Sequence, residues 1–198
     1  MNRILYSSVL LFAIILISVN QRFVIVDLDD SIRQKVQDLW SPDLNKVIIA
    51  ITDFGAEASV LLLTLFTLIY FGIKKQGKVI RFFISGLFGA ILLFSILKDI
   101  IGRARPSSMM VQEEAMSFPS GHATIATVLA WFCFLVFSQS LSAGWKRVLL
   151  TACIVYPLLM SFTRVYLNVH YLSDVIAGIA LGSGWMIFLA KFYLNREA

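Results

Sequence analysis

The sequence predicts an all-α protein, a single bundle of six transmembrane helices over residues 1–198 with a short amphipathic surface helix between the first two spans. Of the 198 residues, 59% are hydrophobic and 15% are charged, whereas soluble domains carry about 45–50% apolar and about 25% charged residues. The mean hydropathy is +0.82. The apolar residues form long runs near the length of about 20 residues that a span needs, and no repeat or low-complexity linker divides them.

The first span is predicted over Ile4–Val19. A signal peptide has a similar apolar run, but here no small-residue cleavage site follows, because the chain continues Asn20-Gln21-Arg22. We therefore expect a retained helix whose flanking residues complete the crossing.

A short helix on the membrane surface is predicted after an acidic segment. Ser31-Ile32-Arg33-Gln34 matches a capping box, and Ser41-Pro42 ends the pattern. Apolar residues follow at helical spacing, with the last as an interfacial anchor: Ile32, Val36, Leu39 and Trp40. An ordinary polar loop is the alternative.

The second span is predicted over Ser59–Ile73, which is short unless it extends back through Val47–Ile51. That extension includes Asp53 and Glu57, which repel each other at a spacing of four residues. The sequence favours a place in the outer interface for both carboxylates, and the alternative is that they face nearby cations.

The four remaining spans are clearer in the sequence. Gly178, Gly182 and Gly184 in the last span allow another helix to approach closely. The predicted ranges are Val79–Ile101, His122–Phe137, Val148–Phe162 and Tyr171–Leu189.

The distribution of charge predicts the orientation. With six spans both termini share a side, and that side carries nine cations against Glu197: Arg3, Lys74, Lys75, Lys78, Arg81, Lys146, Arg147, Lys191 and Arg196. The positive-inside rule then places both termini in the cytoplasm. The net charge of +5 follows from this topology and does not indicate a nucleic-acid partner. Cys133 and Cys153 lie in apolar runs and are interpreted as small buried hydrophobic residues.

Three polar clusters fall on the opposite, outer side. They are Lys98–Pro106 at the end of the third span, Phe118–His122 before the fourth, and Phe162–Asp174 between the fifth and sixth. If the last segment is helical, His170 and Asp174 share a face, so that Asp174 accepts a hydrogen bond from one ring nitrogen and leaves the other free. A buried structural triad of Arg164, His170 and Asp174 is the alternative.

Together the clusters favour phosphoryl chemistry. Cations and the amides at a helix start suit a group whose charge is spread over three oxygens. Two histidines allow one to attack phosphorus and the other to protonate the leaving oxygen. His122 and His170 are the only histidines and nearby cations would repel a divalent ion, so the sequence predicts no metal and no cofactor.

The motifs resemble the type 2 phosphatidic acid phosphatase (PAP2) superfamily, which includes the vanadium haloperoxidases. The family pattern is K-x6-R-P, P-S-G-H and S-R-x5-H-x3-D. It is matched by Lys98 with Arg105-Pro106, by Pro119-Ser120-Gly121-His122, and by Arg164, His170 and Asp174. Thr163 stands where serine is usual and keeps a hydroxyl.

The resemblance implies a role for each matched residue. His170 would be the nucleophile that forms a phosphohistidine, Asp174 would orient it, and His122 would act as general acid and then as base. The phosphate oxygens would be held by Lys98, Arg105, Ser120, Gly121 and Arg164. Arg103 falls outside the pattern and is expected to contact lipid headgroups or to pair with Glu113 or Glu114. Met109, Met110 and Met116 are interpreted as packing residues.

The leading hypothesis is a metal-independent lipid phosphate phosphatase at the outer face of the cytoplasmic membrane. Phosphatidylglycerophosphate or phosphatidate, and undecaprenyl pyrophosphate, are the candidate substrates, because the motifs recognise only phosphate. An intramembrane serine protease using Ser120, and a non-catalytic bundle that binds or transports lipid phosphates, are the alternatives. No motif indicates an oligomeric state.

Overall fold

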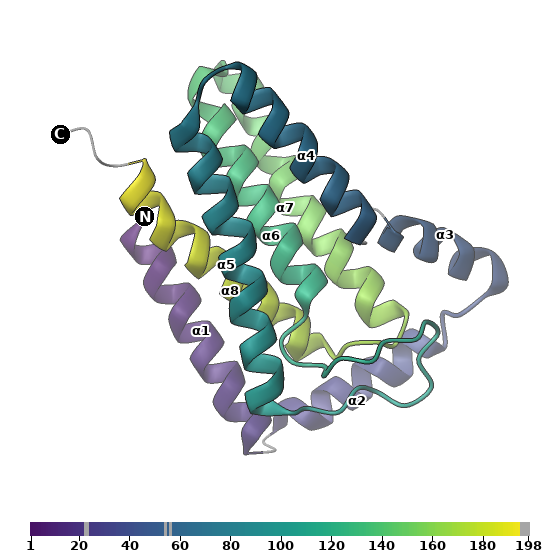
Figure 1. Ribbon diagram of the computed structural model, residues 1–198. Helices are drawn as coiled ribbons and strands as arrows, with labels where there is room; N and C mark the ends of the chain where they lie inside the picture. Colours follow the sequence, from purple (N-terminus) through teal and green to yellow (C-terminus); the bar gives the residue numbers. More distant parts are fainter. Residues whose placement is uncertain (22–23, 54, 56, 195–198) are drawn as a thin grey trace.

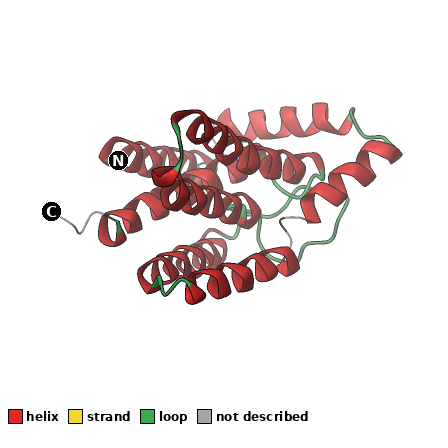
Figure 2. Cartoon of the chain, turned by 90° about the horizontal axis from the view of Figure 1, so that it is seen from above, coloured by secondary structure: helices red, strands yellow, loops and turns green. Residues whose placement is uncertain are grey.

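The structure, a computed structural model, describes residues 1–21, 24–53, 55 and 57–194. Every regular element in these ranges is helical (Figure 1, Figure 2). Six of the described stretches are long and apolar enough to cross a membrane when Pro42–Ile73 is counted as one, which confirms the predicted fold class. The elements are α1 (Asn2–Asn20), α2 (Val24–Gln37), α3 (Pro42–Asp53), α4 (Glu57–Ile73), α5 (Gly77–Ile101), α6 (Gly121–Phe137), a 3-10 turn η1 (Ser138–Ser140), α7 (Ala143–Tyr166) and α8 (Leu172–Tyr193).

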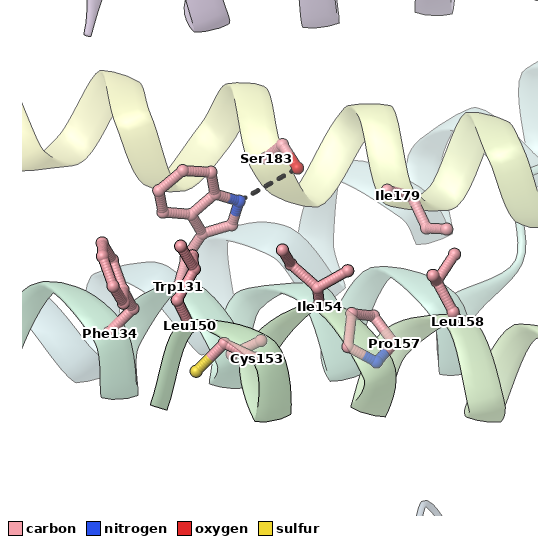
Figure 3. A pocket seen from close by; sticks show the side chains of 10 residues that line it. Trp131, Phe134, Leu150, Cys153, Ile154, Pro157, Leu158, Ile179 and Ser183 are labelled. Carbon is pink, nitrogen blue, oxygen red and sulfur yellow. Dashed lines mark hydrogen bonds between the residues drawn. The ribbon is translucent and has the colours of Figure 1, made fainter. Parts of the chain in front are cut away.

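The centre of the bundle is the pair α6 and α8, which are the most buried of the spans. They contact each other, and α5, α7 and α1 pack around them. A side chain added at Gly178 would meet the carbonyl oxygen of Ser120 at 2.6 Å, so the two backbones nearly touch. In a membrane the hydrophobic effect does not drive helices together, because lipid tails are as apolar as the helices. Small residues instead let the backbones approach and make close van der Waals contact. Farther along, Trp131 donates a hydrogen bond to Ser183 at 3.0 Å (Figure 3).

The spans extend beyond their predicted ends, most of all α7. It begins at Ala143 and ends at Tyr166, whereas the apolar pattern predicted Val148–Phe162. The residues that α7 gains at its two ends, 143–147 and 163–166, include polar side chains. The last turn of α7 contains Arg164. Protein groups surround its side chain, which is only 2% exposed.

The predicted surface helix exists as α2, but its predicted start is wrong. The described helix already runs from Val24, so Ser31 lies inside it rather than at a capping box. Its apolar residues Ile32 and Val36 pack against buried side chains of α6, α7 and α8. Trp40 donates to the carbonyl oxygen of Tyr166 at 2.9 Å. Figure 1 shows α2 across one end of the bundle. Trp40 also packs against buried side chains, whereas Leu39 is 55% exposed.

The second predicted span divides into α3 and α4. Asp53 is exposed, and the side chain of Glu57 lies outside the described residues. Met109 and Met110 pack with Tyr166 as expected, whereas Met116 is 44% exposed. These methionines belong to the loop of residues 102–120, which joins α5 to α6 at the same end of the bundle as α2.

Candidate active site

A cavity of about 430 Å³ opens at the end of the bundle where α2 and loop 102–120 lie. One part of the cavity wall is polar. The other part is apolar and is formed mainly by side chains of α4 and α5. The titratable lining residues are Lys98, Arg105, Glu113, His122 and His170, and the apolar lining includes Val60, Leu61, Leu87, Phe88, Ile91 and Phe94. A second hollow of about 220 Å³ between α6, α7 and α8 has no charged residue in its lining (Figure 3). The chemistry therefore belongs to the first cavity.

His170 and Asp174 are in contact, although the segment between them is not one helix. His170 precedes α8, and Asp174 lies in the first turn of that helix. The Asp174 carboxylate turns back, so that Oδ2 accepts the Tyr171 amide proton at 2.9 Å and lies 3.4 Å from His170 Nδ1. The predicted contact is present, but a helix start rather than a shared helix face produces it.

The other ring nitrogen of His170 faces Arg105. Nη1 of Arg105 lies 3.2 Å from His170 Nε2, and a guanidinium can only donate. The proton therefore sits on Nδ1, toward Asp174, and Nε2 keeps its lone pair. Burial lowers the pKa of His170 to about 4, against the opposing effect of Asp174. A neutral ring whose unprotonated Nε2 accepts a hydrogen bond from Arg105 at the cavity has the properties of a nucleophile.

Two of the predicted phosphate ligands line the cavity as cations. Arg105 is held by carbonyl oxygens from both sides, of Ala115 at 2.6 Å and of Val169 at 2.7 Å. Burial lowers the pKa of Arg105 despite the nearby Glu113, and a guanidinium remains charged at neutral pH. Lys98, in the last turn of α5, donates to the carbonyl oxygen of Met116.

Arg164 and Ser120 are not among the residues that line the cavity. Arg164 donates to Thr52 of α3 at 3.1 Å and pairs with Glu113, which does line the cavity. Ser120 precedes α6 without a side-chain capping bond. Within the described chain, Ser120 Oγ and Arg164 Nε are buried polar atoms without a partner. Buried donors normally have one, so both are available to an anion.

Thr163, which replaces the usual serine, points elsewhere. Its hydroxyl donates to the carbonyl oxygen of Met160 at 2.7 Å and lies 3.1 Å from the hydroxyl of Thr52. The hydroxyl therefore joins α7 to α3 beside Arg164.

The expected partners of Arg103 are wrong. Arg103 pairs with Asp174 at 2.6 Å and with Asp29 of α2 at 2.8 Å, and not with Glu113 or Glu114. Burial opposes its charge, but the two carboxylates outweigh burial and raise the pKa of Arg103. Glu113 instead pairs with Arg105 and Arg164. Burial favours the protonated form of Glu113, yet these arginines lower its pKa overall.

Ser117 was also missed, although it immediately precedes a motif. Its hydroxyl donates to Asp174 Oδ2 at 2.5 Å and lies 3.4 Å from His170 Nδ1. Its place one residue before Phe118 is the only signal in the sequence that points to it. No periodicity or spacing indicated Asp29, which is 144 positions from its partner Ser173.

Known proteins resemble this chain in sequence and in structure. Residues 78–198 match the PAP2 superfamily. Phosphatidylglycerophosphatase B of Bacillus subtilis is 32% identical over 93% of this chain and 92% of its own length. An undecaprenyl-diphosphatase of Sulfolobus acidocaldarius is 32% identical over 74% of this chain and 69% of its own. The crystal structure of a transmembrane PAP2-type phosphatidylglycerolphosphate phosphatase from Bacillus subtilis superposes with a TM-score of 0.85 at 26% identity, covering 98% of this chain and 97% of that one.

Proposed function

Because the chain belongs to the PAP2 superfamily and is a multi-pass membrane hydrolase of lipid phosphates, we propose that it cleaves its substrate through a phosphohistidine on His170. The observation that carries the proposal is the pair formed by His170 Nε2 and Arg105 at 3.2 Å in the cavity. It puts a nucleophilic lone pair beside a cation that can hold a phosphate oxygen.

The first half-reaction transfers the phosphoryl group to the enzyme. Nε2 of His170 attacks phosphorus while the bond from phosphorus to the lipid oxygen breaks, and His122 gives that oxygen its proton. Asp174 stabilises the charge that develops on the ring. The phosphate oxygens are held by Lys98, Arg105, Arg164, Ser120 and the Gly121 amide.

The second half-reaction regenerates the enzyme. His122 now takes a proton from water, the hydroxide attacks phosphorus, and the bond from phosphorus to Nε2 breaks to release inorganic phosphate. His122 is again protonated and Nε2 again holds its lone pair. The cations neutralise the charge for which other phosphoryl-transfer enzymes use a metal ion.

The substrate we propose first is phosphatidylglycerophosphate. The apolar part of the cavity wall suits acyl chains beside a phosphate held at the polar part. The relative that bears this activity in its name aligns over nearly the whole chain. A polyprenyl pyrophosphate is the second candidate, supported by the undecaprenyl-diphosphatase relative.

A phosphate-release panel tests the proposal. Purified enzyme in detergent is assayed with phosphatidylglycerophosphate, phosphatidate, diacylglycerol pyrophosphate and undecaprenyl pyrophosphate, with and without EDTA. We expect release from the first to be fastest, to persist in EDTA, to be inhibited by vanadate and to vanish in His170→Ala. Unchanged release by His170→Ala would rule out the phosphohistidine, and a strict metal requirement would rule out the cationic clamp.

The alternative functions explain less of the site. A protease would need a base beside Ser120, but Ser120 Oγ has no hydrogen-bond partner among the described residues. A binding or transport bundle would not need a neutral His170 beside Asp174. Ser120→Ala distinguishes the protease from the phosphatase. A serine nucleophile would be favoured if this variant lost nearly all activity and a fluorophosphonate labelled the wild type.

A further inference from the structure

Two residues with no role in the proposed reaction, Asp29 and Arg103, form a buried network with Asp174. Arg103 Nη1 donates to Asp174 Oδ1 at 2.6 Å, and Nη2 donates to Asp29 Oδ2 at 2.8 Å. Ser173, next to Asp174, completes the network, since its amide donates to Asp29 at 2.9 Å and its hydroxyl at 2.5 Å. The guanidinium also lies 4.0 Å from the centre of the Tyr171 ring.

The network is buried and its acceptors are satisfied. Asp29 is 2% exposed and Asp174 is fully buried. All four carboxylate oxygens accept hydrogen bonds, because Asp174 Oδ2 also receives the Tyr171 amide and the Ser117 hydroxyl. Buried charges are costly unless paired and hydrogen-bonded in this way. Arg103 therefore bridges two carboxylates rather than serving one.

Because Arg103 bridges Asp29 and Asp174, the two carboxylate oxygens of Asp174 contact different residues. Arg103 takes Oδ1, and Oδ2 remains directed at His170 Nδ1. Asp29 takes the second arm of the guanidinium, which stops Arg103 from closing onto both oxygens of Asp174 as a bidentate pair. Such a pair would compete with His170 for Oδ2.

We propose that Asp29 and Arg103 are positioning residues for Asp174, which makes helix α2 part of the catalytic framework. Neither residue lines the cavity, and both arms of the Arg103 guanidinium are taken by carboxylates, so we assign neither a contact with substrate. The inference rests on the proposed function, in which His170 needs Asp174 to hold its ring. A purely structural role would lower stability and leave turnover per folded molecule unchanged.

The test compares two aspartates on the same helix. Asp29→Asn removes the carboxylate of the network, whereas Asp30→Asn removes the one that pairs with Arg33 at 3.3 Å. We expect Asp29→Asn to lower kcat about 10- to 100-fold, by analogy with the loss of a partner that orients a metal-binding side chain. KM should stay within about twofold because the cavity lining is intact. Asp30→Asn should leave both constants unchanged. Rates are taken per molecule of folded, monodisperse enzyme.

A second variant covers the case in which Asp29→Asn does not fold. Arg103→Lys keeps the charge but replaces the planar fork by a point charge that cannot hold two carboxylates in fixed directions. It should lower kcat in the same range. Because the two residues act as a unit, the Asp29→Asn, Arg103→Lys double variant should lose no more than the worse single variant.

The outcomes distinguish this inference from the proposed function. If the wild type releases phosphate and both folded single variants keep its kcat, the positioning role is wrong and the proposed function stands. A rise in KM at constant kcat would also overturn it. If the wild type releases no phosphate from any lipid in the panel, both proposals fail.

Discussion

At His170, burial and hydrogen bonding act in opposite directions. The ring is 3% exposed, and burial disfavours its protonated form. Asp174 favours the protonated form, while Arg105 and Arg164 oppose it, and the net effect lowers the pKa to about 4. The proposed nucleophile is therefore neutral without help from a base, and in the proposed reaction Asp174 would stabilise the positive ring that forms as phosphorus is attacked.

Titration of the imidazole checks this directly. The chain has two histidines, so ¹⁵N-histidine labelling gives two ring systems, which His122→Ala assigns. As the pH falls through 6.5 the His170 ring should stay neutral, and it should take up a proton only near pH 4. A midpoint near 6.5 would contradict the burial argument.

Glu113 occupies the cations that the proposed mechanism gives to phosphate. It pairs with Arg105 at 3.4 Å and with Arg164, and its lowered pKa keeps it ionised at neutral pH. Phosphate must then displace a carboxylate to reach both arginines. A partly exposed ion pair contributes up to about 1 kcal/mol, and about 1.4 kcal/mol corresponds to tenfold in affinity.

Glu113→Gln should therefore bind inorganic phosphate about 3- to 10-fold more tightly than the wild type, measured as the inhibition constant for phosphate. Glu114→Gln is the matched control, because it makes the same change of charge at the adjacent, exposed residue and should leave the constant unchanged. Weaker binding by Glu113→Gln would mean that Glu113 organises the arginines rather than competing with phosphate.

At the scale of elements, the contact of α6 with α8 brings the segment Pro119–His122 close to His170 and Asp174. The Ser120 amide donates to the carbonyl oxygen of Asp174 at 3.0 Å. Gly178 is what lets the two backbones approach, since an added side-chain carbon there would meet the Ser120 carbonyl oxygen at 2.6 Å. A real carbon atom cannot take that position without moving the start of α6.

Gly178→Ala should therefore destabilise the protein by about 1–3 kcal/mol, as overpacking does, and lower kcat because Gly121 and His122 shift. Gly184→Ala, on the same helix, is the control. Its added carbon would be 3.6 Å from the nearest atom, so it should have no cost and gain up to about 1 kcal/mol of helix propensity. Thermal unfolding in detergent and kcat measure both, and equal effects of the two changes would contradict the account.

The sequence predicted the elements better than their contacts. Apolar runs located the spans, and motif spacing located the residues around the cavity, because both are local properties. The start of α2 was misplaced because Ser31-Ile32-Arg33-Gln34 matches a capping box, whereas the helix already runs from Val24 and its Asp29 is held by Ser173 of α8. The pairing of Arg103 depends on how distant segments pack, and no local pattern contains that information.

At the scale of the whole molecule, charge and architecture agree on an orientation. The start of α1 and the end of α8 lie together, with Lys191 6.0 Å from the ring of Tyr6. The turns that join α4 to α5 and α6 to α7 reach the same end of the bundle, opposite α2 and loop 102–120 (Figure 1). These turns carry Lys74, Lys75, Lys78, Lys146 and Arg147. The positive-inside rule then favours a cytoplasmic position for this end and an outer position for the active site.

Cysteine accessibility in intact cells tests the orientation. In a Cys133→Ala, Cys153→Ala background, Ser107→Cys lies in the cavity-end loop and Gln76→Cys in the turn before α5, and both positions are exposed. A membrane-impermeant maleimide should label Ser107→Cys in intact cells and Gln76→Cys only after permeabilisation. The reverse pattern would put the cations outside, against the surface potential that sets topology, and would place phosphate release in the cytoplasm. The pair also controls for reactivity, because full labelling of both after permeabilisation shows that each thiol is available.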